Sequence, residues 1–377
     1  MYQQCSRNFR VIWYEIVLIF ALVFIKPSSA GADTPPQLTA DSALLMDYYT
    51  GLVLYSYQAA QQRPPASTTK ILTAVLGLEL GSKHEIVSIS RYAACTEGAS
   101  LYLKQGQSFY LYDLIKGALI NSGNDAAVAI AEHIGGKKEF FASLMNYKAK
   151  VIGAKQSQFC NPHGLPDPGH YSTAYDLALM ARYALKNKHF QQIVKTRTGA
   201  IRELTTGTPI GLSNTNRLLW GTGHEIKIFG VKTGTTSAAG QCLVAAAEQN
   251  GRILISVVLH SDDRYSDTLR LLKYGFEKCR WFEVAKKGEP FLTLPVWNGM
   301  FPNVGIGPQE DLVFPINPEQ LPLLEKRVHL EPFLKAPFPA GTRAGKMEVF
   351  LGDRRLAKTD LVTLTPVSQK KWFRRGL

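Results

Sequence analysis

The sequence of 377 residues is poor in the patterns that build metal and redox centres. Its eight histidines show no HExxH or other ligand spacing. Its cysteines match neither a zinc pattern nor a Cys-x-x-Cys pair. We therefore expect no metal and no cofactor. Four cysteines follow the first thirty residues, and they are compatible either with disulfides or with small buried hydrophobic side chains: Cys95, Cys160, Cys242 and Cys279.

Acidic residues are also scarce. The chain has 30 Asp and Glu against 43 Lys and Arg, which gives a formal net charge of +13. Such a surplus draws a protein to anionic surfaces such as cell-wall polymers and phospholipid headgroups. Nucleic-acid binding is the competing interpretation of this charge, but no motif of interleaved aromatic and basic residues supports it.

No apolar run has the roughly 20 residues that a membrane-spanning helix needs. The run Val11–Ile25 comes close, but it is shorter, and it follows Arg7 and Arg10. The small residues 28–30 come after it. This order of basic, apolar and small residues is typical of a secretory signal, with an uncleaved membrane anchor as the alternative. The sequence predicts a signal peptide over residues 1–30, cleavage near Ala30, and an exported protein of the cell wall or periplasmic space.

Residues 31–278 mix helical and strand patterns. Asn250-Gly251 between two apolar runs is a strong hairpin signal, so Lys232-Thr233-Gly234 should lie on a strand of an antiparallel sheet. Ser67 occupies the position of a helix N-cap, and Thr173 occupies another. The expected strands are 43–47, 52–58, 228–236, 241–248 and 252–259, and the expected helices are 71–81, two pieces of 110–135 broken at 121–124, 173–187 and 267–277.

The sequence changes character after about residue 279. Proline becomes frequent, helical periodicity fades, and short β-type runs appear. We therefore expect a separate β-rich C-terminal domain over residues 279–365, after a catalytic domain over 31–278. A basic aromatic tail over 366–377 ends the chain, with cations around Trp372-Phe373.

Ser67 and Lys70 stand three residues apart where a buried helix is predicted to begin, so their side chains share one face. A serine hydroxyl is a poor nucleophile until a neighbour removes its proton. A lysine can do so only if burial or a second cation lowers its pKa by several units. The pair is equally compatible with an N-cap serine and a lysine that extends to solvent. A second Ser-x-x-Lys, residues 368–371, has no apolar helix after it.

Two further tripeptides complete a set: Ser122-Gly123-Asn124 and Lys232-Thr233-Gly234. In this order and these settings, the three motifs resemble the signature of penicillin-binding proteins and serine β-lactamases. The chain is most similar to the low-molecular-mass D-alanyl-D-alanine carboxypeptidases (peptidase S11 family), through PPASTTKILTA, INSGNDAA, NPHGL, HYSTAYDLA and VKTGTTSAAG. The resemblance covers about residues 38–365. It implies an α/β (α+β) transpeptidase-like domain, whose antiparallel sheet is flanked by helices, followed by a small all-β domain.

The resemblance also implies roles for the motif residues. Ser67 would be the nucleophile that takes the acyl group from the penultimate D-alanine, and Lys70 its general base. Ser122 would relay a proton to the leaving amine. Asn124 would hold the substrate amide and orient Lys70. Lys232 would lower the pKa of Lys70 and attract the terminal carboxylate.

The resemblance implies further roles for residues on the strand that carries Lys232-Thr233-Gly234. The substrate would pair along Thr233 and Thr235, and the N–H groups of Ser67 and Thr235 would form an oxyanion hole. Gly234 would let the substrate backbone approach. Arg264 would help to grip the terminal carboxylate, or else be a surface arginine paired with a neighbouring aspartate. The family positions His163, His170 and Asp176 are interpreted as structural.

The implied activity is removal of the last D-alanine from peptidoglycan stem peptides, with β-lactam antibiotics as covalent inhibitors and no nucleic-acid partner. A β-lactamase, a D,D-endopeptidase and a non-catalytic wall-binding protein remain as alternatives. Residues 140–202 contain no glutamate, the residue that class A β-lactamases use for deacylation, so we expect penicillin to be trapped. The tail is compatible with weak contact with anionic lipid or with a disordered solubilising segment.

Overall fold

The computed structural model describes residues 16–21, 35–221, 226–278, 280–316 and 318–370. The chain divides into two units, which we treat separately. The larger unit is Ala32–Cys279, and the smaller unit holds Arg280–Leu377 together with Met1–Gly31.

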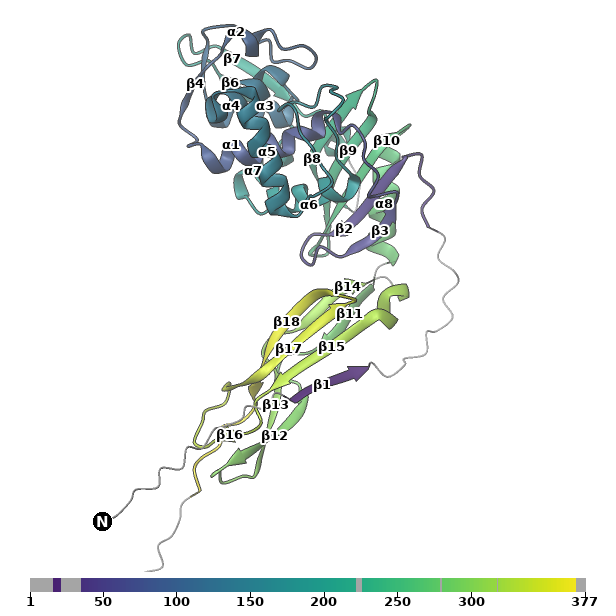
Figure 1. The fold of residues 1–377 in the computed structure, drawn as a ribbon, viewed down its shortest axis with the longest axis vertical. Helices are drawn as coiled ribbons and strands as arrows, with labels where there is room; N and C mark the ends of the chain where they lie inside the picture. Colours follow the sequence, from purple (N-terminus) through teal and green to yellow (C-terminus); the bar gives the residue numbers. More distant parts are fainter. Residues whose placement is uncertain (1–15, 22–34, 222–225, 279, 317, 371–377) are drawn as a thin grey trace, which may run out of the picture. The chain divides into compact units, whose positions relative to one another are not determined.

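The larger unit contains a five-stranded antiparallel sheet in the order β3-β2-β10-β9-β8. Unbroken buried runs in β8, β9 and β10 indicate that both faces of this sheet are covered. Figure 1 shows helices α1 and α3–α7 gathered beside the sheet, and α8 apart from them next to β10. The strands are β2 (Ser42–Asp47), β3 (Val53–Tyr57), β8 (Lys227–Thr236), β9 (Gly240–Gln249) and β10 (Arg252–Ser261).

The turns of this sheet follow from its sequence. Asn250 and Gly251 join β9 to β10 with φ of 50° and 75°, the left-handed values that a tight hairpin turn requires. The predicted hairpin of β2 and β3 and the predicted strand around Lys232 are confirmed. Strand β8 lies at the edge of the sheet, so one side of the third motif is not paired with another strand of the sheet.

The predicted helices are present and begin and end close to the predicted positions, whereas three others, over residues 91–94, 138–152 and 188–195, were not predicted. The break at residues 121–123 separates α3 from α4, and Thr173 caps α6 by accepting a hydrogen bond from the Asp176 N–H. The helices are α1 (Lys70–Leu80), α2 (Arg91–Ala94), α3 (Leu111–Ile120), α4 (Asn124–Gly135), α5 (Lys138–Ile152), α6 (Ala174–Ala184), α7 (Lys188–Lys195) and α8 (Arg264–Lys278). The unit also contains two short two-stranded antiparallel sheets: β4 (Ile86–Ser88) with β5 (Ser108–Tyr110), and β6 (Thr198–Arg202) with β7 (Pro209–Ser213).

The prediction that Ser67 is a helix N-cap is wrong. Ser67 lies inside a 3-10 turn, η1 (Ala66–Thr69), and the α-helix begins only at Lys70. The turn is closed by side chains that sequence periodicity does not register: Thr68 Oγ1 donates to the Pro65 carbonyl, and Thr69 Oγ1 donates to the Ala66 carbonyl. The Ser67 hydroxyl is therefore not used to cap the helix.

The smaller unit is β-rich, as expected. Its main sheet has the order β1-β15-β17-β18-β13-β12-β16, and β11 pairs with β14. Strand β1 belongs to the segment predicted to be a signal peptide, and it forms one edge of this sheet beside β15. Ala30, the predicted cleavage position, lies outside the described residues. The strands are β1 (Ile16–Ala21), β11 (Arg280–Ala285), β12 (Leu292–Trp297), β13 (Asn303–Pro308), β14 (Leu312–Ile316), β15 (Leu324–Leu330), β16 (Leu334–Lys335), β17 (Arg343–Leu351) and β18 (Arg354–Thr363).

Three of the four cysteines fall within the described residues, and all three are free thiols. Cys95 is exposed, Cys160 is partly exposed and Cys242 is buried. The interpretation as a small buried hydrophobic side chain therefore holds for Cys242. Cys279 lies outside the described residues.

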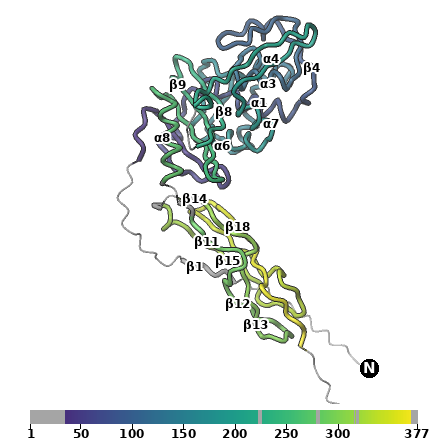
Figure 2. The backbone as a smooth tube through the Cα atoms, turned by 180° about the vertical axis from the view of Figure 1, so that it is seen from behind, coloured from purple at the N-terminus to yellow at the C-terminus, as the bar shows by residue number. Residues whose placement is uncertain are grey.

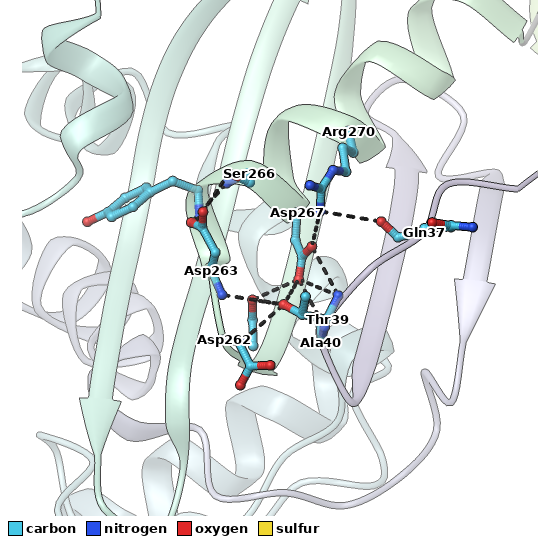
Figure 3. A network of polar contacts seen from close by, with 10 residues as sticks. Gln37, Thr39, Ala40, Asp262, Asp263, Ser266, Asp267 and Arg270 are labelled. Atoms are coloured by element: carbon cyan, nitrogen blue, oxygen red, sulfur yellow. Dashed lines mark hydrogen bonds and ion pairs between the residues drawn. The ribbon is translucent and has the colours of Figure 1, made fainter.

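A buried carboxylate joins α8 to the segment that enters β2 (Figure 3). Asp267 has no exposed surface, and its oxygens accept hydrogen bonds from the N–H groups of Thr39 and Ala40 and from the hydroxyls of Thr39 and Ser261. Arg270, one turn later in α8, pairs with it at 3.2 Å. This network fixes the first turn of α8, which carries Arg264.

We expect Asp267→Ala to destabilise the larger unit by about 3–5 kcal/mol, because removing one partner of a buried charged network leaves its donors unsatisfied. Chemical denaturation followed by tryptophan fluorescence measures the loss. Asp262→Ala is the matched control, since Asp262 lies nearby but is exposed, and it should change stability by less than about 0.5 kcal/mol. Equal effects of the two substitutions would contradict a special role for Asp267.

Candidate active site

Ser67 and Lys70 meet at the start of α1. The turn η1 begins at Ala66, whose backbone is held at a φ of 48°, a strained value for a residue with a side chain. Lys70 Nζ lies 2.8 Å from Ser67 Oγ. The predicted proximity of the two side chains is therefore present, although the turn that creates it is a 3-10 turn.

Lys70 is completely buried, and its amine lies among three oxygens. Besides Ser67 Oγ, they are Asn124 Oδ1 at 2.7 Å and the His163 carbonyl at 2.9 Å. A carbonyl or amide oxygen can only accept a hydrogen bond, whereas a hydroxyl can also donate. A neutral Lys70 amine therefore donates its two N–H groups to Asn124 and His163. Its lone pair then faces the Ser67 hydroxyl, which is the geometry that a general base requires.

The charges around Lys70 favour this neutral form. Burial, and then the positive charge of Lys232, hold the pKa of Lys70 well below the ordinary lysine value of 10.5, while Asp125 opposes them. Lys232 is itself buried, and its Nζ donates to the Thr233 carbonyl at 3.0 Å. Burial and the nearby Arg264 lower the pKa of Lys232 to about 7. The site thus pairs a lysine whose pKa is held well below its ordinary value with one that is partly charged at neutral pH.

The second motif approaches from the turn between α3 and α4. Ser122 is largely buried, with a φ of 65°, and Asn124 begins α4. The Asn124 amide is held from both ends, because its Oδ1 accepts from Lys70 and its Nδ2 donates to the Glu97 carbonyl at 2.6 Å. Asn124 therefore fixes the position of the Lys70 amine.

The third motif lies directly against the nucleophile. A Cβ atom added to Gly234 would stand 2.9 Å from the Ser67 nitrogen and 3.0 Å from the Ala66 Cβ. Only glycine lets β8 pack this closely on η1. From the sequence, Gly234 was expected to let a substrate backbone approach. In the structure, the atom nearest to a Cβ placed on Gly234 is the Ser67 backbone nitrogen.

Arg264, in the first turn of α8, reaches β8. Its Nη1 donates to the Gly234 carbonyl at 2.9 Å and to Thr235 Oγ1 at 2.7 Å. The structure therefore shows Arg264 in contact with β8, and its role toward a substrate carboxylate stays a prediction. The Lys232 and Arg264 cations both contact residues 233–235 of β8.

The role of the His163 carbonyl was not predicted from the sequence, whereas the structural role expected of His170 is confirmed. The segment 161–164 presents the His163 carbonyl to Lys70, and a Cβ atom on Gly164 would lie only 1.8 Å from the Ala66 carbonyl oxygen. His170 supports the turn through Thr69 Oγ1, at 2.8 Å. Burial lowers the pKa of His170 to about 4, so its imidazole is neutral at physiological pH. These residues lie in the sequences NPHGL and HYSTAYDLA. The role of a backbone carbonyl cannot be predicted from residue type, because every residue has one.

We expect Gly234→Ala to slow the acylation of Ser67 by about 100-fold, because a displacement of about 1 Å at the reacting group has an effect of this size. The rate of labelling by a fluorescent penicillin measures the change. Gly211→Ala on β7 is the control, since a Cβ atom there would have no neighbour within 4 Å. Normal labelling of Gly234→Ala would show that the close packing of β8 on η1 is dispensable.

Comparison with known proteins agrees with this geometry. Residues 29–263 match the Peptidase_S11 family, described as D-alanyl-D-alanine carboxypeptidase, and residues 281–369 match the C-terminal domain of penicillin-binding protein 5. D-alanyl-D-alanine carboxypeptidase DacC of Escherichia coli is 34% identical over 94% of this chain and 92% of its own length. DacD of the same organism is 31% identical over 95% of this chain and 97% of its own.

Solved structures show the same relationship. Penicillin-binding protein 5 from Haemophilus influenzae superposes with a TM-score of 0.69 at 30% identity, covering 90% of this chain and all of the other. Penicillin-binding protein 6B from Escherichia coli gives 0.66 at 28% identity, over 89% of this chain and 98% of the other. With matching motifs, fold and second unit, this chain belongs to the D-alanyl-D-alanine carboxypeptidase family, Peptidase_S11.

Proposed function

We propose that this D-alanyl-D-alanine carboxypeptidase works through an acyl-enzyme on Ser67. The Ser67 oxygen attacks the carbonyl carbon of the penultimate D-alanine while its proton passes to the Lys70 amine. The C–N bond to the terminal D-alanine then breaks, and the leaving amine takes up a proton. Water hydrolyses the Ser67 ester in the second half of the reaction. The observation that carries this proposal is the buried Lys70 amine, whose Nζ lies 2.8 Å from Ser67 Oγ and also contacts two oxygens that can only accept hydrogen bonds.

The second motif has a supporting role in the proposed reaction. Asn124 holds the Lys70 amine so that the lone pair keeps its direction. Ser122, buried two residues earlier in the same turn, passes the proton from Lys70 to the leaving amine. A relay is needed because the proton leaves one oxygen and must arrive at a nitrogen on the other side of the breaking bond.

The substrate binds along β8, whose edge position leaves a side open for one more strand. Its backbone pairs beside Thr233 and Thr235, and its carboxylate faces Lys232 and Arg264. The N–H groups of Ser67 and Thr235 bind the oxyanion, and a single donor of this kind contributes about 3 kcal/mol. Stem peptides ending in D-Ala-D-Ala are the proposed substrates. Penicillins, which carry a reactive amide and a carboxylate, are the proposed covalent inhibitors.

Within residues 140–202, the chain lacks the glutamate that class A β-lactamases use for deacylation. These residues are all described by the structure. In this part of the chain, the His163 carbonyl contacts Lys70 Nζ. A carbonyl oxygen cannot remove a proton from water as a carboxylate base does. Penicillin should therefore stay bound to Ser67. Cleavage of cross-links would use the same residues and is the second candidate activity.

We expect mass spectrometry after incubation with penicillin to find one adduct, on the peptide that contains Ser67 and Lys70. Ser67→Ala should abolish the adduct, and Lys70→Ala should nearly abolish it, because the hydroxyl then lacks its base. Ser368→Ala, in the other Ser-x-x-Lys sequence, is the control and should label normally. An adduct elsewhere, or rapid repeated turnover of nitrocefin, would contradict the proposal.

The two lysines predict a bell-shaped pH profile of kcat/KM. Activity rises with pH as Lys70 becomes neutral, at a pKa well below 10.5. It falls again as the pH passes about 7, because Lys232 then loses the charge that attracts the carboxylate. Lys232→Gln should remove the alkaline limb while lowering kcat/KM throughout. An alkaline limb that survives this substitution would show that another group is responsible.

We propose further that the protein is exported after removal of residues 1–30 and that it binds anionic membrane surfaces through its smaller unit. Among the described residues, none of the helices has the length and apolarity to cross a membrane. Instead, four large apolar side chains near β12 and β16 are more than half exposed: Trp297, Met300, Phe301 and Phe333. Figures 1 and 2 show β12 at the end of this unit opposite to β11 and β14.

Basic residues accompany these side chains. Lys335 Nζ lies 5.1 Å from the centre of the Trp297 ring. The start of the C-terminal tail lies next to these exposed side chains. The Lys370 N–H donates to the Asn298 carbonyl, and the Met300 N–H donates to the Ser368 carbonyl. Aromatic side chains next to cations are suited to the headgroup region of an anionic bilayer. Each cation near such a surface contributes about 1 kcal/mol.

We expect the mature protein to float with vesicles that contain phosphatidylglycerol and not with purely zwitterionic vesicles. Deleting residues 369–377, or making Trp297→Ala together with Phe301→Ala, should lower the bound fraction at least about 10-fold, since several cations or two interfacial aromatics are lost. Phe140→Ala, an exposed aromatic of the larger unit, is the control. Unchanged flotation of both altered proteins would rule out this surface.

A further inference from the structure

We infer that Tyr265 closes the groove at its carboxylate end and thereby confines the enzyme to peptides that terminate there. The inference rests on the proposed function and adds a specificity-determining residue to it. Tyr265 follows Arg264 in the first turn of α8, and its side chain is partly exposed. Tyr265 is not part of the Lys232-Thr233-Gly234 motif, and it is distinct from the neighbouring Arg264.

Hydrogen bonds and one cation–π contact link five residues beside β8. Arg264 Nη1 donates to Thr235 Oγ1 at 2.7 Å, and the Arg264 guanidinium lies 5.0 Å from the centre of the Tyr265 ring. The Tyr265 hydroxyl donates to the Thr215 carbonyl at 3.1 Å. Thr215 Oγ1 lies 2.6 Å from Thr233 Oγ1, which belongs to β8. We call these residues the carboxylate circuit: Thr215, Thr233, Thr235, Arg264 and Tyr265.

The chemistry of the carboxylate circuit fits the end of a peptide. Each of its members carries a hydroxyl or guanidinium donor, and the buried Lys232 precedes Thr233 on the same strand. A carboxylate accepts several such hydrogen bonds at once, and charged ones are the strongest. One residue of extended peptide spans at most about 3.6 Å. A carboxylate one residue beyond the carbonyl attacked by Ser67 therefore falls next to Thr233 and Thr235.

Backbone hydrogen bonds fix the positions of the two residues that form the closure, Tyr265 and Thr215. Asp263 Oδ1 accepts hydrogen bonds from the N–H groups of Tyr265 and Ser266, each at 3.2 Å, so the Tyr265 backbone is fixed at the helix start. On the other side, the Thr215 N–H donates to the Ile120 carbonyl at 3.1 Å. A peptide that continued past the carboxylate position would have to displace the Tyr265 ring or break its hydrogen bond to Thr215.

The experiment compares two substrates: diacetyl-L-Lys-D-Ala-D-Ala, and the same peptide with glycine added to its C-terminus. The readout is kcat/KM for cleavage between the two D-alanines, measured by release of D-Ala or of D-Ala-Gly. Tyr265→Ala removes the closure. Tyr265→Phe separates the two contributions, because it keeps the ring and removes only the hydrogen bond to Thr215. Stoichiometric labelling of Ser67 by penicillin shows that each variant is folded and that the proposed mechanism operates.

We expect the wild-type enzyme to prefer the free-acid peptide by about 100-fold or more, because extension removes the carboxylate that would pair with the Lys232 and Arg264 cations. Tyr265→Ala should lower this preference at least about 10-fold, chiefly by raising kcat/KM for the extended peptide, and Tyr265→Phe should lower it less, because the ring remains in place. An unchanged preference in Tyr265→Ala, with normal labelling of Ser67, would overturn the inference alone. Absence of labelling in the wild type would overturn the proposed function as well.

Discussion

The site depends on one constraint: the amine of Lys70 is buried, and a buried charge is costly. Removing an ammonium ion from water has an effective penalty of several kcal/mol even after the protein relaxes. Lys70 has no exposed surface, and its nearest positive neighbour, Lys232, is buried as well. The neutral amine is therefore the form that the fold favours. A neutral amine among two pure acceptors and one hydroxyl can accept a proton only from that hydroxyl, which belongs to Ser67.

Much of the larger unit serves to build this environment. The three oxygens around Lys70 come from the turn before α1, the start of α4 and the segment before α6, so that distant parts of the chain must fold before the site exists. Strand β8 completes the site by packing Gly234 against the Ser67 N–H. Helix α8, held through Asp267, brings Arg264 to the same strand. In this D-alanyl-D-alanine carboxypeptidase, stability of the fold and reactivity of the serine thus share the same contacts.

Local signals predicted much of the architecture. Asn250-Gly251 requires a left-handed turn, and Thr173 can cap a helix, so both features are visible in a few neighbouring residues. The three motifs identified the residues that converge, because chemistry restricts which side chains can activate a serine. The N-cap role of Ser67 was wrong, since the choice between a 3-10 turn and a helix depends on Thr68, Thr69 and the packing of Gly164.

Other features lay beyond sequence reasoning for a physical reason. The His163 carbonyl acts through the backbone, which every residue possesses, and the contact between Tyr265 and Thr215 joins residues 50 positions apart. The need for glycine at 234 was foreseen, but its nearest neighbour, the Ser67 N–H, appears only once η1 and β8 are packed. Pairing of β1 with β15 likewise joins opposite ends of the chain.

The most direct test of this account is the protonation state of Lys70 in the free enzyme. Protein labelled with ¹³C at the lysine Cε allows its signal to be followed by NMR against pH, with Lys70→Ala identifying the resonance. The account predicts a neutral Lys70 amine near pH 7.5, with a pKa well below 10.5. A Lys70 signal that stays fully protonated at neutral pH, and titrates like that of an exposed lysine, would contradict it.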